Sequence, residues 1–391
     1  MSKFHSYIAS AEKLISTYSP GKPLPLHIRA FFAADKKFGS RDRRMISSAC
    51  YCYFRIGHAC DDKTTVEKIL TGIFLCEHKS NELLLFFRPD LDSQIGLSIA
   101  DKISTAGIQL KDIFPFRDEL ATGIDIDSFS TSFLKQPQLY LRIRPGRKDK
   151  VISKLNEASV PFEWQGEACV VLANNVAADK ILLLNKDAVV QDINSQKVLD
   201  QLDSMPLFST AKQKTTAWDC CAASGGKSIL LYDKLRGNVQ LTVSDIRENI
   251  LWNLNKRLQQ AAININRNFI TDLAVSSGLQ AEEKFSVIIC DAPCSGSGTW
   301  GRSPEQLRFF KKKQINEFAE RQQQIVAHII PHLDKAGVFF YITCSVFKKE
   351  NEEMASFIKD KFPQLNLLQM EYLKGYENGA DSMFVACFQL T

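Results

Sequence analysis

The 391-residue sequence lacks several features that would fix its class at once. It has no paired CxxC knuckles, no internal repeat, no low-complexity tract and no apolar run long enough to cross a membrane. The N-terminal stretch MSKFHSYIASAEKLIS has no signal-peptide core, and the eleven cysteines are an odd number. We therefore expect a cytoplasmic monomer with reduced thiols, no membrane association and no bound metal.

A strong excess of charge is also absent. The formal net charge is +5, with 24% charged and 45% hydrophobic residues, an ordinary globular balance. A basic surface for nucleic acid would therefore have to come from local clustering of lysine and arginine. The length is sufficient for two or three domains.

Three segments of different character follow one another along the chain. Residues 1–132 carry apolar residues at helical spacing and predict a helical domain. Residues 133–205 include QLYLRIRPGRKDK, an alternating strand before a Pro-Gly turn, and predict a small α/β module. In residues 206–391 apolar strands alternate with helices. This last pattern predicts a largely parallel sheet covered by helices on both faces.

The ends of the expected strands carry the chemistry, because ligands of such sheets bind beyond the carboxyl ends. The first strand runs into DCCAASGGKS, a glycine turn that matches neither the GxGxxG nor the P-loop pattern. It predicts a nucleotide or adenosyl site, with a plain tight turn as the alternative. Asp245 ends the second strand, where an acid can bind the ribose hydroxyls, and Asp272 ends the third strand, where it would lie beside the adenine. The alternative for each is an acidic helix N-cap. Together these residues favour a nucleoside-shaped pocket.

Two cysteines occupy similar positions further along. Cys294 follows the fourth strand in DAPCSGSG beside Asp291, and Cys344 ends the fifth strand in YITCS. Sheet topology allows both thiols to point into one crevice. Cys290 belongs to the strand itself, and we interpret it as a small buried hydrophobe.

These motifs resemble a known family. DAPCSGSGTWGRSPE and YITCSVFKKENEE, together with WDCCAASGGKS, SDIRENIL, ITDLA and GADSMFVACFQL, resemble the RNA (cytosine-5)-methyltransferases of the bacterial Sun, or RsmB, type. The resemblance covers residues 206–391 and implies a Rossmann-like methyltransferase domain that uses S-adenosylmethionine. Upstream, QLYLRIRP and VVQDINSQ resemble the RRM-like module of this family. The helices of residues 1–132 resemble, more loosely, its NusB-like RNA-binding domain.

The resemblance implies a role for each motif residue. Cys344 would add to C6 of the cytosine, which makes C5 nucleophilic, and Cys294 would help to release the product. Asp291 would hold the cytosine edge as charge develops, and Lys227 would orient Asp291 or favour a thiolate. Ser224 stands where the family usually has proline, so we expect a less preorganised turn. The implied cofactor-binding residues are Cys221, Ala222, Ala223, Ser224, Gly225, Gly226, Lys227, Asp245, Asp272 and Asp291.

We expect clusters of lysine and arginine to contact the phosphates of the RNA. The target cytosine must be flipped out of its helix or already unpaired. Arg142 and Arg144 lie on one face of a strand, and we expect them to face solvent or phosphate because a charged row is costly to bury. The alternative for each cluster is a solvated surface. The residues interpreted as phosphate contacts are Lys36, Lys37, Arg41, Arg43, Arg44, Arg142, Arg144, Arg147, Lys148 and Arg302, with the run Arg308–Lys313.

Several other functions compete with methylation of small-subunit (16S) ribosomal RNA. A tRNA substrate is the nearest alternative, because nothing in the motifs reads sequence around the target. A DNA cytosine methyltransferase would use Cys294 as its nucleophile. A catalytically inactive, RNA-binding ribosome-assembly factor should lack Cys344, Asp291 or Asp245, and all three are present. A NAD-dependent oxidoreductase should show the GxGxxG fingerprint. The order of domains favours 16S rRNA.

Overall fold

The computed structural model describes residues 2–35, 37–205 and 213–391, so the expected domain boundary at Pro206 lies outside the described residues. The chain forms two compact units. The first combines Met1–Gln136 with Thr299–Lys312, and the second combines Pro137–Gly298 with Lys313–Thr391. Across the described ranges, no helix is both long and apolar enough to cross a membrane.

The first unit is helical, which confirms the prediction for the N-terminal region. Thr64 and Glu67 form a capping box at the start of one helix, with the Thr64 side chain accepting the Glu67 N–H. Buried Arg55 donates from Nη1 to the carbonyl oxygens of Phe133 (2.9 Å) and Gly301 (3.0 Å), and so ties the returning segment to these helices. The helices are α1 Lys3–Thr17, α2 Leu24–Ala34, α3 Ser40–Arg55, α4 Thr65–Cys76, α5 Glu82–Phe87, α6 Pro89–Asp92, α7 Ile99–Ala106, α8 Leu110–Ile113, α9 Ile126–Ser132 and α15 Glu305–Phe309.

The second unit begins with a small four-stranded sheet in the order β2-β3-β1-β4, with every pair antiparallel. Val151 and Leu155 of one helix pack against Leu141 and Ile143 of the first strand. The elements are β1 Leu139–Ile143, α10 Lys148–Glu157, β2 Glu163–Trp164, β3 Cys169–Leu172, β4 Ala188–Val190 and α11 Ile193–Lys197.

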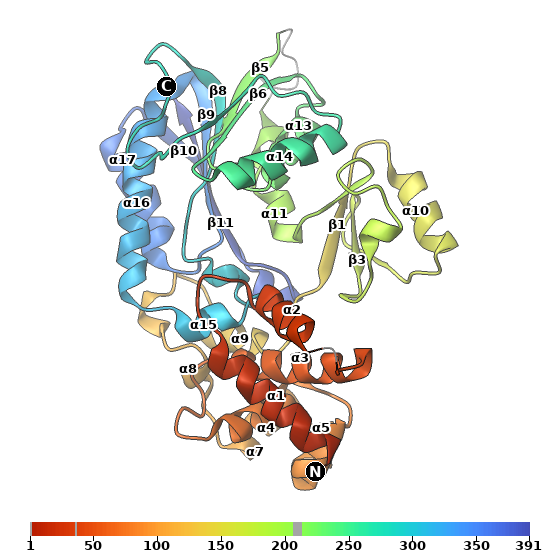
Figure 1. Ribbon diagram of the computed structural model, residues 1–391. Helices are drawn as coiled ribbons and strands as arrows, with labels where there is room; N and C mark the ends of the chain where they lie inside the picture. The colour runs from red at the N-terminus through yellow and green to blue at the C-terminus, as the bar shows by residue number, and fades with distance from the viewer. Residues whose placement is uncertain (1, 36, 206–212) are drawn as a thin grey trace. The chain divides into compact units, whose positions relative to one another are not determined.

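A seven-stranded sheet in the order β10-β11-β9-β8-β5-β6-β7 fills the rest of this unit (Figure 1). The five adjacent strands β9, β8, β5, β6 and β7 are parallel to one another, as predicted. The strand β11 runs antiparallel to β9, and β10 runs antiparallel to β11. The strand β10 was not predicted from the sequence. The elements are β5 Thr215–Asp219, α13 Gly226–Lys234, β6 Val239–Asp245, α14 Glu248–Gln260, β7 Arg267–Ile270, β8 Phe285–Asp291, α16 Lys313–Ile329, β9 Leu333–Thr343, α17 Glu352–Lys361, β10 Leu365–Leu373 and β11 Met383–Leu390.

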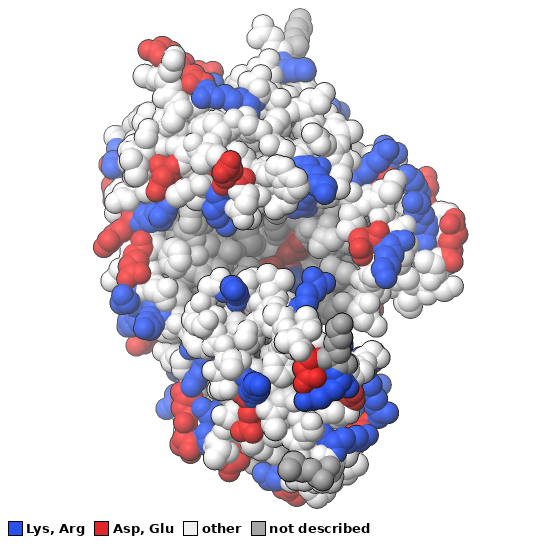
Figure 2. All heavy atoms as spheres, viewed as in Figure 1, with Lys and Arg blue, Asp and Glu red and all other residues white. Residues whose placement is uncertain are grey.

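Helices cover both faces of the large sheet. Alternate strand residues such as Val287 and Ile289 pack with α13 and α14, while Ile288 and Cys290 pack with α16 and α17 on the other face. Because both faces are buried, these strands appear in the sequence as continuous apolar runs. In the face shown in Figure 2, basic and acidic side chains are interspersed, which agrees with the small net charge.

Candidate active site

A pocket of about 520 Å³ lies at the carboxyl ends of β5, β6, β7, β8 and β9. This volume is in the usual range for a small-molecule site. The structure therefore brings together strand-end residues that are far apart in the sequence. The sequence-predicted residues that line the pocket are Cys221, Ala223, Asp245, Asp272, Asp291, Cys294 and Cys344.

The glycine turn after β5 has a strained and tightly packed backbone. Gly225 has φ +83°, and a Cβ there would lie 2.3 Å from Cδ1 of Leu254. Ala223 has φ +45°, which is unusual for a residue with a side chain, and its N–H donates to Oδ2 of Asp245 at 3.0 Å. The Arg257 guanidinium donates to both Oγ (2.9 Å) and the carbonyl of Ser224 (2.8 Å). The serine that replaces the family's proline is thus held by a side chain from α14.

Two carboxylates border the pocket at the ends of β6 and β7. Burial opposes ionisation of Asp245, but hydrogen bonds from Arg247 and from the Ala223 N–H hold the pKa of this carboxyl below its ordinary value. Asp272 Oδ1 accepts hydrogen bonds from the Ala274 N–H and from Arg321, both at 3.0 Å. Asp245 is therefore an ionised acceptor at the wall of the pocket.

The two motif thiols meet in this pocket. Cys294 Sγ and Cys344 Sγ are 3.5 Å apart, because β8 and β9 are neighbouring parallel strands that end at the same edge. Both side chains are partly exposed. The hydrogen bond with Cys344 and burial raise the pKa of the Cys294 thiol well above its ordinary value. Cys294 is therefore a neutral thiol next to Cys344.

Lys227 and Asp291 form an ion pair beside the thiols. Lys227 Nζ lies 2.6 Å from Asp291 Oδ2. Burial disfavours the charged ammonium, but the Asp291 carboxylate outweighs burial and raises the pKa of Lys227. The lysine therefore remains positively charged and paired with the Asp291 carboxylate.

Sequence reasoning missed Glu350, which connects the two cysteine loops. Its Oε1 accepts the Ser345 hydroxyl at 2.6 Å, and its Oε2 accepts the Ser295 N–H at 2.8 Å. Each donor immediately follows one of the motif cysteines in sequence. The side chain is fully buried, and burial raises its pKa. The acid-rich run KKENEE gives no sign of which carboxylate turns inward.

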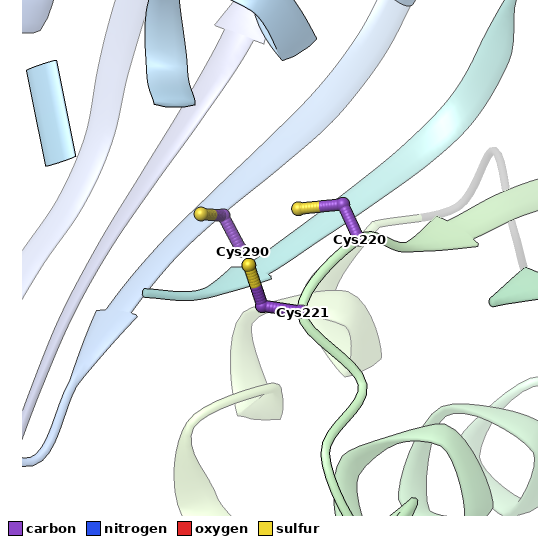
Figure 3. A group of neighbouring side chains, drawn as sticks. All are labelled: Cys220, Cys221 and Cys290. Carbon is purple, nitrogen blue, oxygen red and sulfur yellow. The ribbon is translucent and has the colours of Figure 1, made fainter. Parts of the chain in front are cut away.

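Three further thiols gather where β5 and β8 end. Cys220, Cys221 and Cys290 have sulfur atoms that all lie within 4.8 Å of one another (Figure 3). Cys290 is fully buried in the apolar core, as expected, but it also belongs to this group. The sequence does not reveal the grouping, because Cys290 is seventy residues away from the other two.

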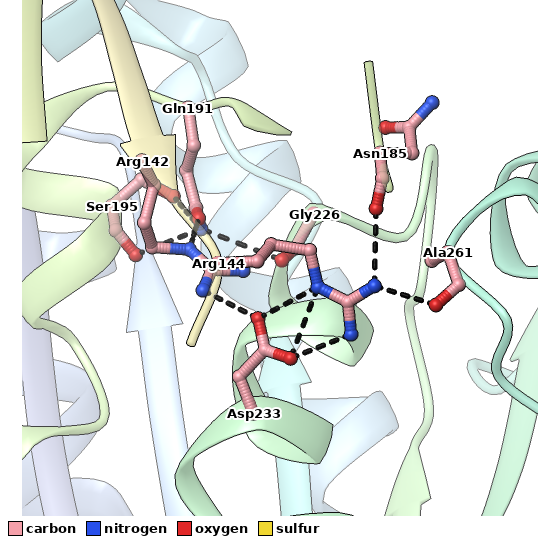
Figure 4. A network of polar contacts seen from close by, with 8 residues as sticks. All are labelled: Arg142, Arg144, Asn185, Gln191, Ser195, Gly226, Asp233 and Ala261. Atoms are coloured by element: carbon pink, nitrogen blue, oxygen red, sulfur yellow. Dashed lines mark hydrogen bonds and ion pairs between the residues drawn. The ribbon is translucent and has the colours of Figure 1, made fainter. Parts of the chain in front are cut away.

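The expectation that Arg142 and Arg144 face solvent or phosphate is wrong. Their side chains are 7% and 10% exposed, and both pair with Asp233 of α13, at 2.6 and 2.7 Å (Figure 4). Arg142 also donates to Gln191, and Arg144 donates to the carbonyl of Ala261. The buried charges are tolerated because an acid and several oxygen acceptors surround them.

The other basic residues expected to bind RNA have mixed surroundings. Lys36 lies outside the described residues. Exposed Lys37 and Arg41 pair with acids of the helical unit, Asp35 and Glu82. Arg302 belongs to the segment Thr299–Lys312 of that unit, and Arg43, Arg44 and Lys148 are exposed. Arg147 and Lys150 lie within 4.0 Å of the buried carboxylate of Asp187.

A mixed sheet with this strand order and a pocket at its carboxyl edge defines a Rossmann-like methyltransferase fold. The crystal structure of PH0851 has a TM-score of 0.73 to the chain at 17% identity, over 99% of this chain and 98% of that one. The crystal structure of NSun6 from Pyrococcus horikoshii with SFG has a TM-score of 0.58 at 14% identity, over 72% and 96%. At these identities the likeness establishes the fold alone.

Residues 207–387 match the family model described as 16S rRNA methyltransferase RsmB/F. The chain is 24% identical over 245 residues to the ribosomal RNA small subunit methyltransferase B of Yersinia enterocolitica, covering 60% of this chain and 54% of that relative. It spans about half or less of the curated relatives it matches. Residues 207–387 of this chain are thus similar to the RsmB/F methyltransferases, which confirms the resemblance.

Proposed function

We propose that this protein transfers a methyl group from S-adenosylmethionine to C5 of a cytosine in RNA, with 16S rRNA as the substrate. One observation carries the proposal. In a domain similar to the RsmB/F methyltransferases, Cys294 and Cys344 place two sulfur atoms 3.5 Å apart in one pocket, beside the Lys227–Asp291 ion pair.

The pocket suits an adenosyl cofactor. Its volume is sufficient for a nucleoside, and Asp245 and Asp272 are acceptors for hydroxyl or amine donors. The turn from Cys221 to Lys227 presents backbone groups at the start of α13. The likeness to a structure solved with SFG, an analogue of S-adenosylmethionine, supports the same cofactor. The cofactor would supply an electrophilic methyl group on a positively charged sulfur.

The chain's own residues provide the activation of the base. The Cys344 thiolate attacks C6 and forms an S–C6 bond, which leaves C5 nucleophilic. N3 takes up a proton from solvent during the attack, and Asp291 accepts hydrogen bonds from this N3–H and from the exocyclic amine, while Lys227 fixes Asp291. After methylation the ring releases its C5 and N3 protons to solvent, and the S–C6 bond breaks with its electron pair returning to the Cys344 sulfur. Cys294, as a neutral thiol, donates a hydrogen bond to the departing Cys344 thiolate.

The choice of 16S rRNA rests on the family model and on relatives named as small-subunit rRNA methyltransferases. We infer that the small module is RRM-like, because it has the order β-α-β-β-β and the antiparallel arrangement β2-β3-β1-β4. The helical unit and this module would hold the RNA while the pocket receives a flipped or unpaired cytosine.

The first test uses the purified chain, labelled S-adenosylmethionine, and separate pools of unmethylated 16S rRNA and tRNA. Cys344→Ala, Cys294→Ala and the matched control Cys76→Ala, a partly exposed cysteine of the helical unit, are compared with the wild type. Denaturing gels detect covalent RNA adducts.

The expected result is label in 16S rRNA with the wild type and with Cys76→Ala, no label with Cys344→Ala, and a trapped adduct with Cys294→Ala. Label in tRNA alone would keep the chemistry and overturn the substrate. An adduct that depends on Cys294 and survives loss of Cys344 would reverse the roles of the thiols. Absence of label in both RNAs with every variant would favour the inactive assembly factor.

A further inference from the structure

The proposed reaction uses Cys294 and Cys344 but leaves the three thiols of Cys220, Cys221 and Cys290, here called the thiol triad, without a role. The Cys220 N–H donates to the Ile289 carbonyl at 3.0 Å, which fixes the end of β5 beside β8. This bond places Cys220 and Cys221 next to Cys290, the penultimate residue of β8.

Access and protonation differ within the thiol triad. Cys220 and Cys290 are fully buried, whereas Cys221 is partly exposed, and Cys220 and Cys221 both line the pocket at the carboxyl edge. Hydrogen bonds from the Cys220 and Cys290 thiols lower the pKa of the Cys221 thiol. A thiophilic species in the pocket would therefore meet a reactive sulfur first and find two more behind it.

The spacing of the sulfur atoms suits one small, soft centre. A centre with bonds of about 2.3 Å to three sulfur atoms requires sulfur–sulfur distances of about 4 Å or less. The three sulfur atoms lie within 4.8 Å of one another, so they would have to move closer by less than about 1 Å. Among the described residues, no carboxylate or imidazole joins the three sulfur atoms within that limit. A zinc ion, which prefers four ligands, would have to take its fourth from solvent.

Charge decides which centre fits. Three thiolates around Cu⁺ or Zn²⁺ leave a net negative charge of two or one in a largely buried site, which is costly. Three thiolates around a trivalent centre are neutral. Arsenite meets this condition, because As(OH)₃ and three thiols give As(S–Cys)₃ and three waters, with no change in oxidation state. We propose that the thiol triad is a binding site for trivalent arsenic, three-coordinate and all-sulfur.

The site lies in the wall of the proposed cofactor pocket, so occupancy should also weaken cofactor binding. That consequence rests on the proposed function, whereas arsenic binding itself does not. The test therefore measures arsenic without cofactor or RNA, and failure of one proposal leaves the other intact.

The experiment uses the full chain, reduced, with the double substitution Cys294→Ser/Cys344→Ser to remove the competing thiol pair. Sodium arsenite is added, and native mass spectrometry and alkylation of the remaining free thiols report the outcome. We expect one arsenic atom per chain, with loss of three hydrogens, and protection of Cys221 from alkylation while the other partly exposed thiols, Cys60 and Cys76, stay reactive.

In the same background, Cys221→Ser should weaken arsenite binding at least about tenfold, because the third bond is lost. Cys76→Ser should leave binding unchanged. Cys221 is partly exposed, so its substitution is the variant least damaging to the core, and an unchanged unfolding midpoint would show that the fold survives. Absence of bound arsenic, protection of other cysteines, or full affinity in Cys221→Ser would overturn the proposal.

Discussion

At the scale of single residues, Asp219 is the clearest source of pH dependence. It is fully buried at the end of β5, where Oδ2 accepts the Ser228 hydroxyl at 2.6 Å. Burial raises its pKa to about 7 from 3.8. Because the folded state then holds a proton that the unfolded state has lost, this residue lowers stability as pH rises from about 4 to about 7.

Replacing Asp219 by Asn tests this assignment. The neutral amide mimics the protonated acid, so Asp219→Asn should gain stability relative to the wild type between pH 5 and pH 8, by as much as about 4 kcal/mol. Thermal unfolding of both proteins across this range provides the measurement. Ser228→Ala, which removes the donor but leaves the carboxyl, should keep the wild-type direction of the pH dependence. A constant difference between Asp219→Asn and the wild type would contradict the raised pKa.

Glu350 is a positioning residue, because it contacts the loops of both motif cysteines and neither sulfur. In Glu350→Gln an amide NH₂ replaces one acceptor oxygen, so either the Ser345 hydroxyl or the Ser295 N–H loses its partner. Leaving a buried donor without its acceptor costs about 1–3 kcal/mol. We expect adduct formation to slow by about 10- to 100-fold with little change in KM for RNA. Exposed Glu353, replaced by Gln, is the control and should behave as the wild type.

At the scale of elements, Gly298 pins the loops after β8 and β9 to the start of β11. Its N–H donates to the Cys344 carbonyl at 2.8 Å, and its carbonyl accepts the Ser382 N–H at 2.9 Å. A Cβ at Gly298 would lie 2.2 Å from the Ser382 carbonyl oxygen, so backbone must move.

Gly298→Ala should therefore separate these loops and widen the gap between the thiols of Cys294 and Cys344. We expect a loss of about 1–3 kcal/mol in stability and a larger loss of methylation rate. Thermal unfolding and single-turnover methylation measure the two effects. Gly96→Ala, at a site where a Cβ meets nothing within 4 Å, is the matched control. Equal effects at both glycines would refute the pinning role.

The inner strands around the pocket, such as β8 and β9, were predictable because both of their faces are largely buried. The segments VIIC of β8 and VFFYI of β9 are apolar runs, and the chemistry follows where each run ends. The edge strand β10 was missed because LNLLQMEYL is mostly exposed or half-buried, so no strong apolar alternation marks it. Glu350 was missed because one inward carboxylate in an acidic run has no distinctive sequence pattern.

Long-range pairing was the part that the sequence could not provide. Arg142 and Arg144 share a strand face, as their spacing requires, but Asp233 lies about ninety residues further along the chain. A row of charged residues on a strand predicts that their side chains are exposed to solvent, unless a buried residue of opposite charge is known to face them. The same reason hid the thiol triad, whose third sulfur comes from a different strand.

At the scale of the whole molecule, Asp233 connects the small sheet to the methyltransferase sheet within one compact unit. Asp233→Asn would leave two buried guanidinium groups without their counter-charge. We expect a loss of about 3–5 kcal/mol in stability, with faster hydrogen exchange in β1. Asp200→Asn removes an exposed carboxylate from Lys234, which keeps Asp203 as a partner, and should cost less than about 1 kcal/mol. An Asp233→Asn protein as stable as Asp200→Asn would mean that the small sheet is held by apolar packing.

The buried arginines also change which surface is available for the RNA binding proposed above. With Arg142 and Arg144 committed to Asp233, the small module offers exposed Lys148, whose Nζ lies 4.6 Å from the centre of the half-exposed Trp164 ring. A lysine beside an aromatic surface suits a phosphate next to a stacked base. Lys148→Ala should weaken RNA binding and lower the salt slope by about 1, without changing the unfolding midpoint. Lys335→Ala, at the start of β9 and thus at the opposite edge from the pocket, should leave the slope unchanged. Equal salt slopes for the wild type and Lys148→Ala would mean that this module does not contact the RNA, and would favour the helical unit as the binding surface.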